Sequence, residues 1–397
     1  MKREEEVLLP EETATSPVKK PETKSVPGRV QTQDAGALSQ WQLVRLRFSK
    51  HRLAVIALMI LIFAYFVALF AEFFALYPPN ETRGGKSYSP PQTIGFSLRE
   101  GGFYTHPMDL QIDPITLQKY YIENQDSVQK LGFFVKGNKY RLWGLIPMER
   151  HFFGLKAPKA EGLAADRFYL LGADKFGRDI ASRLVYGARI SLSIGLVSIA
   201  VTFFLGVIIG GISGYIGGSV DNLIQRTIEV INSFPTLPLW LAFAAIMPGD
   251  WPALKVYFAI TIVLSLLGWT GLARVVRGKI LSLREEDYAV AARLLGAGHG
   301  RIIFLHLLPA FVSHIIVTLS LSVPGMILGE TALSFLGLGL RPPVVSWGVM
   351  LQECMNMDVV ANYPWLLLPV VFIILTVLSF NFLGDGLRDA ADPYSSK

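Results

Sequence analysis

The residues whose types and spacing could carry a function lie between Arg274 and Pro309, in the longest polar and basic interval of the C-terminal half. Within it, DYAVAARLLG has a helix-forming composition, and the glycines of AGHG end that helix. Apolar runs long enough to cross a bilayer lie on both sides. A short helix between two membrane spans is placed to receive a contact from the aqueous side.

Patterns for catalysis are missing from the sequence. It contains no G-x-x-x-x-G-K-[ST] phosphate loop, no H-E-x-x-H and no G-x-S-x-G. Its six histidines show no ligand spacing, and its single cysteine, Cys354, excludes a Cys-based metal cage. We therefore expect a protein that is not an enzyme and binds no metal or cofactor.

Energy-coupling residues are also nearly missing from the span centres. Glu330, just past the fifth expected span, is the main exception, and we interpret it as a satisfied interfacial carboxylate. A protein of this kind is either a passive path or is driven by a partner. The polar helix between the fourth and fifth spans favours a partner.

Composition places the chain in the membrane. Of its 397 residues, 51% are hydrophobic and 17% are charged, and the mean hydropathy is +0.41. These values are typical of a polytopic membrane protein. The net charge of +6 is explained by basic cytoplasmic segments, so we expect no nucleic-acid partner.

The apolar runs predict an all-α polytopic protein with six transmembrane helices. The expected spans cover residues 53–76, 190–215, 228–247, 255–272, 308–328 and 364–383. Six basic residues then share one side, whereas the short loop from Pro248 to Leu254 carries no Lys or Arg. The positive-inside rule puts both termini in the cytoplasm. The basic residues are Arg274, Arg277, Lys279, Arg284, Arg293 and Arg301.

The remaining segments have different compositions. Residues 1–38 predict a disordered cytoplasmic tail, and residues 39–52 predict an amphipathic helix on membrane lipid, or only a basic anchor for the first span. Residues 77–180 predict a small extracytoplasmic insert of mixed or β character, with a hairpin turn around Gly137-Asn138. Residues 181–393 form the core, in which glycines of the second span favour close helix packing within the same chain.

The interval from Tyr288 to Pro309 resembles the EAA loop of ABC-importer permeases. Val290-Ala291-Ala292, then Gly296, then Leu308-Pro309 stand at the spacing of that motif. Val290 stands where the family prefers Glu, and His306 where it often has Ile. Glu285, Glu286 or Asp287 could substitute for the missing carboxylate.

Three further segments resemble the dipeptide, oligopeptide and nickel permease family, C-type subunit. They are residues 171–192, 330–351 and 380–393, whereas the long insert is not covered by the resemblance. The resemblance implies the type I ABC-importer fold and a coupling helix over residues 287–298. It implies that the coupling contacts are Asp287, Tyr288, Ala289, Ala291, Ala292, Arg293, Leu295, Gly296 and His299.

The resemblance also implies a multi-pass protein of the bacterial inner membrane, its partners and its mechanism. A second homologous permease pairs with this chain, one or two ATPase subunits bind ATP and Mg, and an extracytoplasmic binding protein delivers substrate. ATP-driven closure of the ATPases moves the coupling helices and switches the path by alternating access. Peptides are the expected substrate and oligosaccharides the alternative, while a passive solute channel is the alternative from another class. We expect the insert to contact the binding protein or to cap the outer mouth.

Overall fold

In the computed structural model, residues 40–99, 101–115, 119–156 and 167–391 are described. The tail predicted over residues 1–38 lies outside them. The first helix, α1 (Gln40–Lys50), covers most of the segment predicted to be amphipathic. Residues from Val44 onward belong to one compact unit, which contains every feature discussed below.

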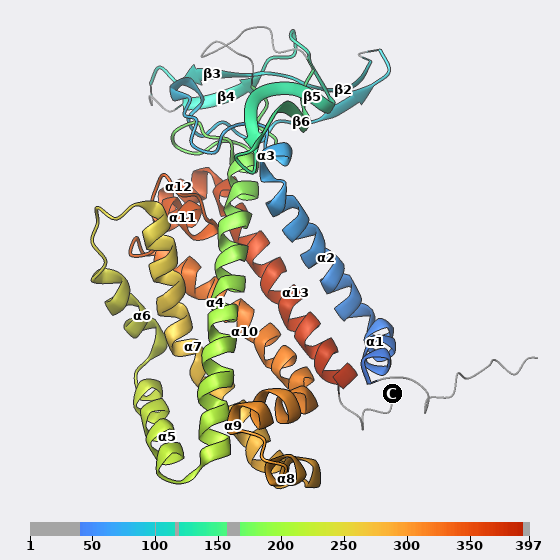
Figure 1. Ribbon diagram of the computed structural model, residues 1–397. Helices are drawn as coiled ribbons and strands as arrows, with labels where there is room; N and C mark the ends of the chain where they lie inside the picture. Colours follow the sequence, from blue (N-terminus) through green and yellow to red (C-terminus); the bar gives the residue numbers. More distant parts are fainter. Residues whose placement is uncertain (1–39, 100, 116–118, 157–166, 392–397) are drawn as a thin grey trace, which may run out of the picture. The chain divides into compact units, whose positions relative to one another are not determined.

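Long apolar helices make up most of that unit (Figure 1). Among the described residues, five are long and apolar enough to cross a membrane, or six if one bent pair counts as a span. They are α2 (Arg52–Leu69), α4 (Ile180–Ile216), α7 (Ala253–Leu283), the helix His299–Phe335 that ends in α10 (Val312–Phe335), and Pro364–Ala391, which contains α13 (Leu368–Ala391). The all-α polytopic class is confirmed.

The third expected span is a bent pair of helices rather than one rod. α5 (Gly218–Ser233) and α6 (Thr236–Ala245) meet at 84°. Phe234 lies between them with ψ at 138°, because a residue that precedes a proline disfavours the helical conformation. The ten residues of α6 extend only about 15 Å at 1.5 Å per residue, half of a hydrocarbon core of about 30 Å.

Glycines bring α4 and α7 into close contact. A Cβ at Gly206 would lie 2.8 Å from Leu272, and a Cβ at Gly210 would lie 2.5 Å from the carbonyl oxygen of Ala273. Gly214 meets the backbone of Arg277 in the same way, at 2.8 Å. Three glycines at four-residue spacing therefore pack within the same chain, as the sequence predicted.

The end of this pair that lies away from the β strands is tied to α5. Arg277 donates from Nε and from its terminal nitrogen to the two carboxylate oxygens of Asp221, at 2.6 and 2.5 Å. Ser213 donates to the same carboxylate. A bidentate Arg–carboxylate pair fixes direction as well as distance, so α5 is held against α4 and α7.

The insert between the first two long helices is built of strands, which confirms its β character. One antiparallel sheet has the order β1-β2-β5-β6, and β3 pairs with β4. The strands are β1 (Gly95–Ser97), β2 (Gly102–Thr105), β3 (Met108–Ile112), β4 (Lys119–Glu123), β5 (Gln129–Leu142) and β6 (Ile146–Leu155).

The hairpin turn predicted at Gly137-Asn138 is wrong. β5 runs through these two residues, where its register with β6 shifts between Lys136 and Tyr140. The chain turns instead at Trp143 and Gly144, with φ at 51° and 75°. A glycine inside a strand can mark a bulge as well as a turn, and here it marks the bulge.

The insert is joined to the helices through Ser182 of α4, whose Oγ accepts hydrogen bonds from the N–H groups of Leu76 and Tyr77, both at 3.0 Å.

Short elements complete the unit. These elements are α3 (Ala71–Phe74), the 3-10 turn Gly84–Lys86, α8 (Asp287–Leu294), α9 (His299–Arg301), α11 (Trp347–Leu351), the 3-10 turn Gln352–Met355, α12 (Met357–Asn362) and the 3-10 turn Pro364–Leu367.

Candidate functional site: the coupling segment

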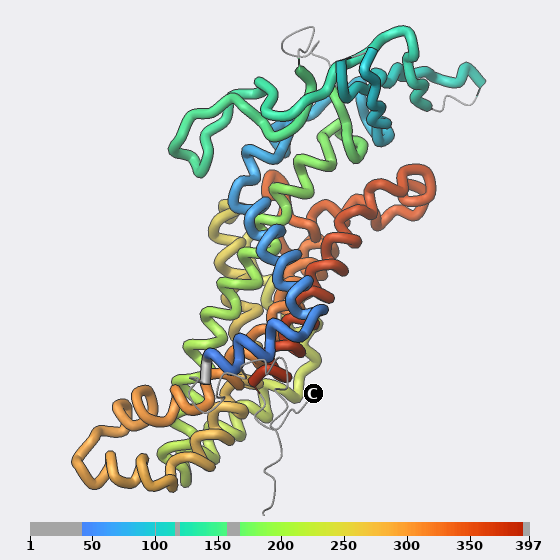
Figure 2. The backbone as a smooth tube through the Cα atoms, turned by 90° about the vertical axis from the view of Figure 1, so that its right-hand side faces the viewer, coloured from blue at the N-terminus to red at the C-terminus, as the bar shows by residue number. Residues whose placement is uncertain are grey.

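The segment singled out by the sequence connects α7 to α10. α7 ends at Leu283, and α8 begins at Asp287, after Glu286 in an extended conformation. Figure 2 shows α8 and α9, in orange, projecting from the helices at the end away from the β strands. The 31 residues of α7 extend about 46 Å at 1.5 Å per residue, so one helix links the loop before Ala253 to this segment.

The helix predicted over residues 287–298 is shorter, because α8 ends at Leu294. The N–H of Ala297 donates to the carbonyl of Ala292, and the N–H of Gly296 donates to that of Arg293, both at 3.0 Å. This pair of bonds is a Schellman cap, which requires a left-handed residue just after the helix. Gly296 has φ at +83° and supplies it.

One side of α8 is buried against the helices. Ala289 is 2% exposed, and Ala292 and Ala297 pack beside it on the same cluster. That cluster consists of Val207, Leu272, Val276, Ile280, Ile302, Ile303, Leu307, Phe311 and Ile315. The small alanines let α8 approach α7 and the start of the next helix closely. Ala289 was predicted as a partner contact, but its burial makes it a residue that positions α8.

The other side of α8 exposes an apolar surface. Tyr288 is 42% exposed, Leu294 82% and Leu295 88%, and Ala291 is exposed between them. Tyr288, Ala291 and Leu295 stand at i, i+3 and i+7 and so share one face of the helix, and Leu294 lies at its edge, three residues after Ala291. These four residues are named here the α8 stripe. Leu294 was not among the predicted site residues. Its signal was its place beside Leu295, just before the glycine that ends the helix.

The predicted charged residues surround the α8 stripe. Asp287 lies in the first turn of α8 and Arg293 in its last turn, as the helix dipole favours, and both are exposed. Burial, together with the charge of Glu286, raises the pKa of Tyr288, so its hydroxyl stays neutral. His299 is exposed, and its ring lies 5.3 Å from that of Tyr215.

Val290 is half-buried and follows three acidic residues. Glu285 pairs with Arg284 at 3.0 Å, while the side chains of Glu286 and Asp287 are exposed. Negative charge is therefore present one turn before the position at which the family prefers Glu.

Leu308-Pro309 marks a change of helix type. The chain forms a π-helical turn over Ile302–Leu307 and a 3-10 turn over Leu308–Phe311 before α10 begins. Proline lacks an N–H and clashes with the carbonyl four residues earlier, which disfavours the regular α-helical bonds around Pro309. His306, the other departure from the family motif, lies half-buried in the π-helical turn.

At the start of α4, near the β strands, a charged network connects two loops. Arg178 donates to Asp174 at 2.6 Å and to Glu353 at 2.8 Å, and Asp174 also accepts from the N–H of Phe176. Burial raises the pKa of Glu353. The network joins the loop before α4 to the connection before α13.

Glu330 lies on α10 and is fully buried by its neighbours. Its carboxylate accepts hydrogen bonds from Ser191 of α4 at 3.1 Å and from Ser334 at 2.8 Å. The group is therefore satisfied, as expected, but it holds two long helices together.

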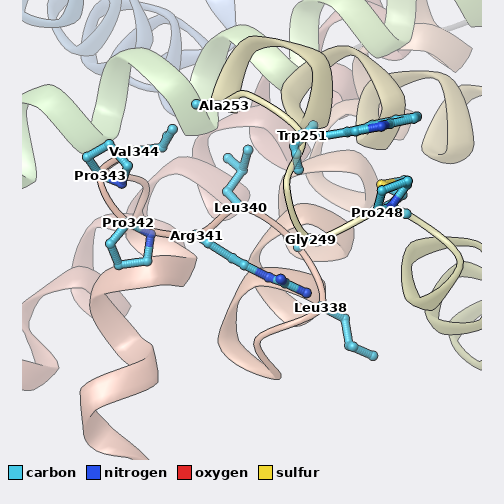
Figure 3. Close-up of a pocket in the computed structure, with 13 residues that line it drawn as sticks. Pro248, Gly249, Trp251, Ala253, Leu338, Leu340, Arg341, Pro342, Pro343 and Val344 are labelled. Atoms are coloured by element: carbon cyan, nitrogen blue, oxygen red, sulfur yellow. The ribbon is translucent and has the colours of Figure 1, made fainter.

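A small pocket lies where the loop before α7 meets the loop after α10. Figure 3 shows Arg341 extended toward Gly249 and Leu338, with the Trp251 ring and Pro342-Pro343 at other edges. Its volume is about 140 Å³. Ligand pockets usually measure about 300–1,000 Å³, so this one is too small to enclose a peptide. Over the described residues, no group of three His, Cys, Asp or Glu side chains could hold a metal ion.

The helices define a multi-pass membrane protein, with an exposed apolar segment at one end. Comparison with known proteins gives its family. Residues 206–396 match the model described as "Binding-protein-dependent transport system inner membrane component", and residues 39–91 match "N-terminal TM domain of oligopeptide transport permease C".

Characterised relatives support the same assignment. The chain is 41% identical to the dipeptide transport system permease protein DppC of Bacillus subtilis, over 58% of this chain and 69% of the relative. It is 42% identical to the glutathione transport system permease protein GsiD of Pectobacterium atrosepticum, over 56% and 72%. A solved MetNI methionine ABC transporter matches 52% of this chain and 95% of its own, with 18% identity and a TM-score of 0.42.

The chain belongs to the family of ABC-importer permeases, multi-pass proteins of the inner membrane. Within that family it is a permease of the oligopeptide C type. In this family the ATPase activity lies in separate subunits.

Proposed function

We propose that this chain forms, with a second homologous permease, the path through which an ATP-driven importer moves peptides, and that α8 couples the path to ATP hydrolysis. The observation that carries the proposal is the α8 stripe. Two leucines more than 80% exposed, at the end of a helix of eight residues, require a partner surface. A cleft in an ATPase subunit is the partner that the family offers.

The contacts around α8 explain how movement reaches the membrane. Ala289 fixes α8 on the cluster that joins the ends of α4, α7 and the helix of α10. The backbones of α4 and α7 touch at Gly210 and Gly214, so these helices cannot slide independently. A displacement of α8 then tilts the group of helices and switches the path between its two openings.

ATP and Mg bind to the one or two ATPase subunits, and this chain holds no ATPase site of its own. The α8 end lies in the cytoplasm, together with both termini. The β insert lies outside, where an extracytoplasmic binding protein delivers the substrate.

Peptides are the proposed cargo because of the relatives. Those that match at about 40% identity are named dipeptide, oligopeptide and glutathione permeases. Oligosaccharides are the alternative cargo, and a passive channel the alternative function.

The test uses the complete complex, with its binding protein, in lipid vesicles. Peptides of two to several residues should stimulate ATP hydrolysis and accumulate inside, whereas oligosaccharides should do neither. If only oligosaccharides stimulated ATP hydrolysis, the cargo would be oligosaccharides and not peptides. If this chain alone carried solute flux without ATP, its function would be that of a passive channel and not of an importer subunit.

A further inference from the structure

The hairpin formed by β5 and β6 ends in an exposed apolar tip, defined here as residues 141–147. Leu145 is 79% exposed, Ile146 49% and Trp143 46%. Phe134, further back on β5, is 57% exposed. Apolar side chains gathered at one exposed turn indicate a contact surface rather than a solvated loop.

One hydrogen bond fixes the depth of this tip relative to the first long helix. The indole N–H of Trp143 donates to the carbonyl oxygen of Leu69 at 2.8 Å. Leu69 is the last residue of α2, whose composition fits a membrane span. The tip therefore lies at the level at which that span leaves the hydrocarbon region.

The tip also continues the exposed apolar side of α2. The Trp143 ring lies 5.3 Å from that of Phe70, which lies 4.9 Å from that of Phe66. Phe66 and Leu69 are each at least half exposed, and so is Phe63 one turn earlier. An unbroken apolar surface runs from the lipid-facing helix onto the hairpin.

Cationic residues flank the apolar ones. Lys139, just before the tip, and Arg141, at its start, are exposed near the end of β5. A Trp ring, exposed aliphatic side chains and basic side chains gathered at one turn are the combination that suits a phospholipid interface.

We propose that the hairpin tip inserts into the lipid headgroup and upper acyl region of the bilayer and anchors the β insert there. The assignment to the outer leaflet rests on the topology given in the proposed function, whereas the insertion itself does not depend on it. Trp143 positions the tip, because its N–H is satisfied by Leu69 while its ring faces the lipid. The basic residues bind lipid phosphates.

The experiment places a fluorophore at the tip of the full complex in lipid nanodiscs. Cys354 is first replaced by Ser, and Leu145→Cys is labelled with nitrobenzoxadiazole. Ile115→Cys, 91% exposed at the turn after β3, is the matched control on the same insert. The quencher is a phospholipid that carries a nitroxide on its acyl chain, close to the headgroup.

Quenching should be several-fold stronger at residue 145 than at residue 115. Adding Trp143→Ala should lower quenching at residue 145 without changing recovery of the complex. Equal quenching at both positions would overturn the proposal. The proposal would also be overturned if neither the lipid nitroxide nor aqueous iodide quenched the fluorophore at residue 145, because a protein partner would then cover the tip. This experiment measures fluorescence quenching and not transport. Its result can therefore be interpreted even if the complex does not import peptides.

Discussion

Gly296 determines how α8 ends. Its φ of +83° lies where an alanine costs about 1–2 kcal/mol, although no atom lies within 4 Å of the position a Cβ would take. Gly296→Ala should therefore loosen the end of the α8 stripe and reduce the amount of ATPase subunit that co-purifies. Gly298→Ala is the control, because Gly298 has φ at −68° and equally open surroundings. Equal effects of the two changes would contradict the role of the cap.

Val290 tests whether the missing glutamate matters. A Glu at this position would lie one turn after Glu286, and like charges at that spacing cost about 0.2–0.5 kcal/mol. Since acidic groups already precede it, Val290→Glu should change peptide-stimulated ATP hydrolysis little, whereas Glu286→Gln with Asp287→Asn should lower it. A large gain from Val290→Glu would show that the neighbours do not replace the usual carboxylate.

At the scale of elements, the approach of α4 to α7 depends on Gly210. A Cβ there would lie 2.5 Å from a backbone oxygen of α7, and overpacking of this kind costs about 1–3 kcal/mol. Gly210→Ala should lower the thermal unfolding temperature of the purified complex. Gly271→Ala, on α7 with no atom within 4 Å of its Cβ, should leave it unchanged or raise it. The reverse order would mean that the two helices do not pack here.

The start of α4 should make stability depend on pH. Burial raises the pKa of Asp179, the N-cap of α4, from 3.8 to about 6. Because this folded value lies above the unfolded one, the contribution of Asp179 to stability is full below about pH 4 and is lost as pH rises to 6. Two pKa units correspond to about 3 kcal/mol.

Asp179→Asn keeps an oxygen that can cap Ser182 and removes the charge. Relative to the unaltered protein, this variant should gain stability between pH 4.5 and pH 7 in thermal unfolding. A constant difference across that range would contradict the assignment.

For the whole molecule, sequence patterns predicted the long helices, the β insert and the glycine packing, because hydropathy and small-residue spacing act locally. The sharp break at Phe234-Pro235 could not be predicted from the sequence, since its angle depends on tertiary contacts. The turn at Trp143-Gly144 was missed because Gly137-Asn138 has equally strong local turn preference. Burial of Ala289 and exposure of Leu294 were also missed, since only the packed cluster decides which side of α8 faces inward.

The central claim is that the α8 stripe carries ATP-driven movement into the membrane path. The most direct measurement is peptide-stimulated ATP hydrolysis by the complete complex in lipid. It compares a double variant, Leu294→Asp together with Leu295→Asp, with the control Leu98→Asp, which changes a similarly exposed leucine of the insert. The stripe variant should lose most of the stimulated activity and release the ATPase subunit, while the control keeps both. Undiminished stimulation with both stripe leucines replaced would contradict the account.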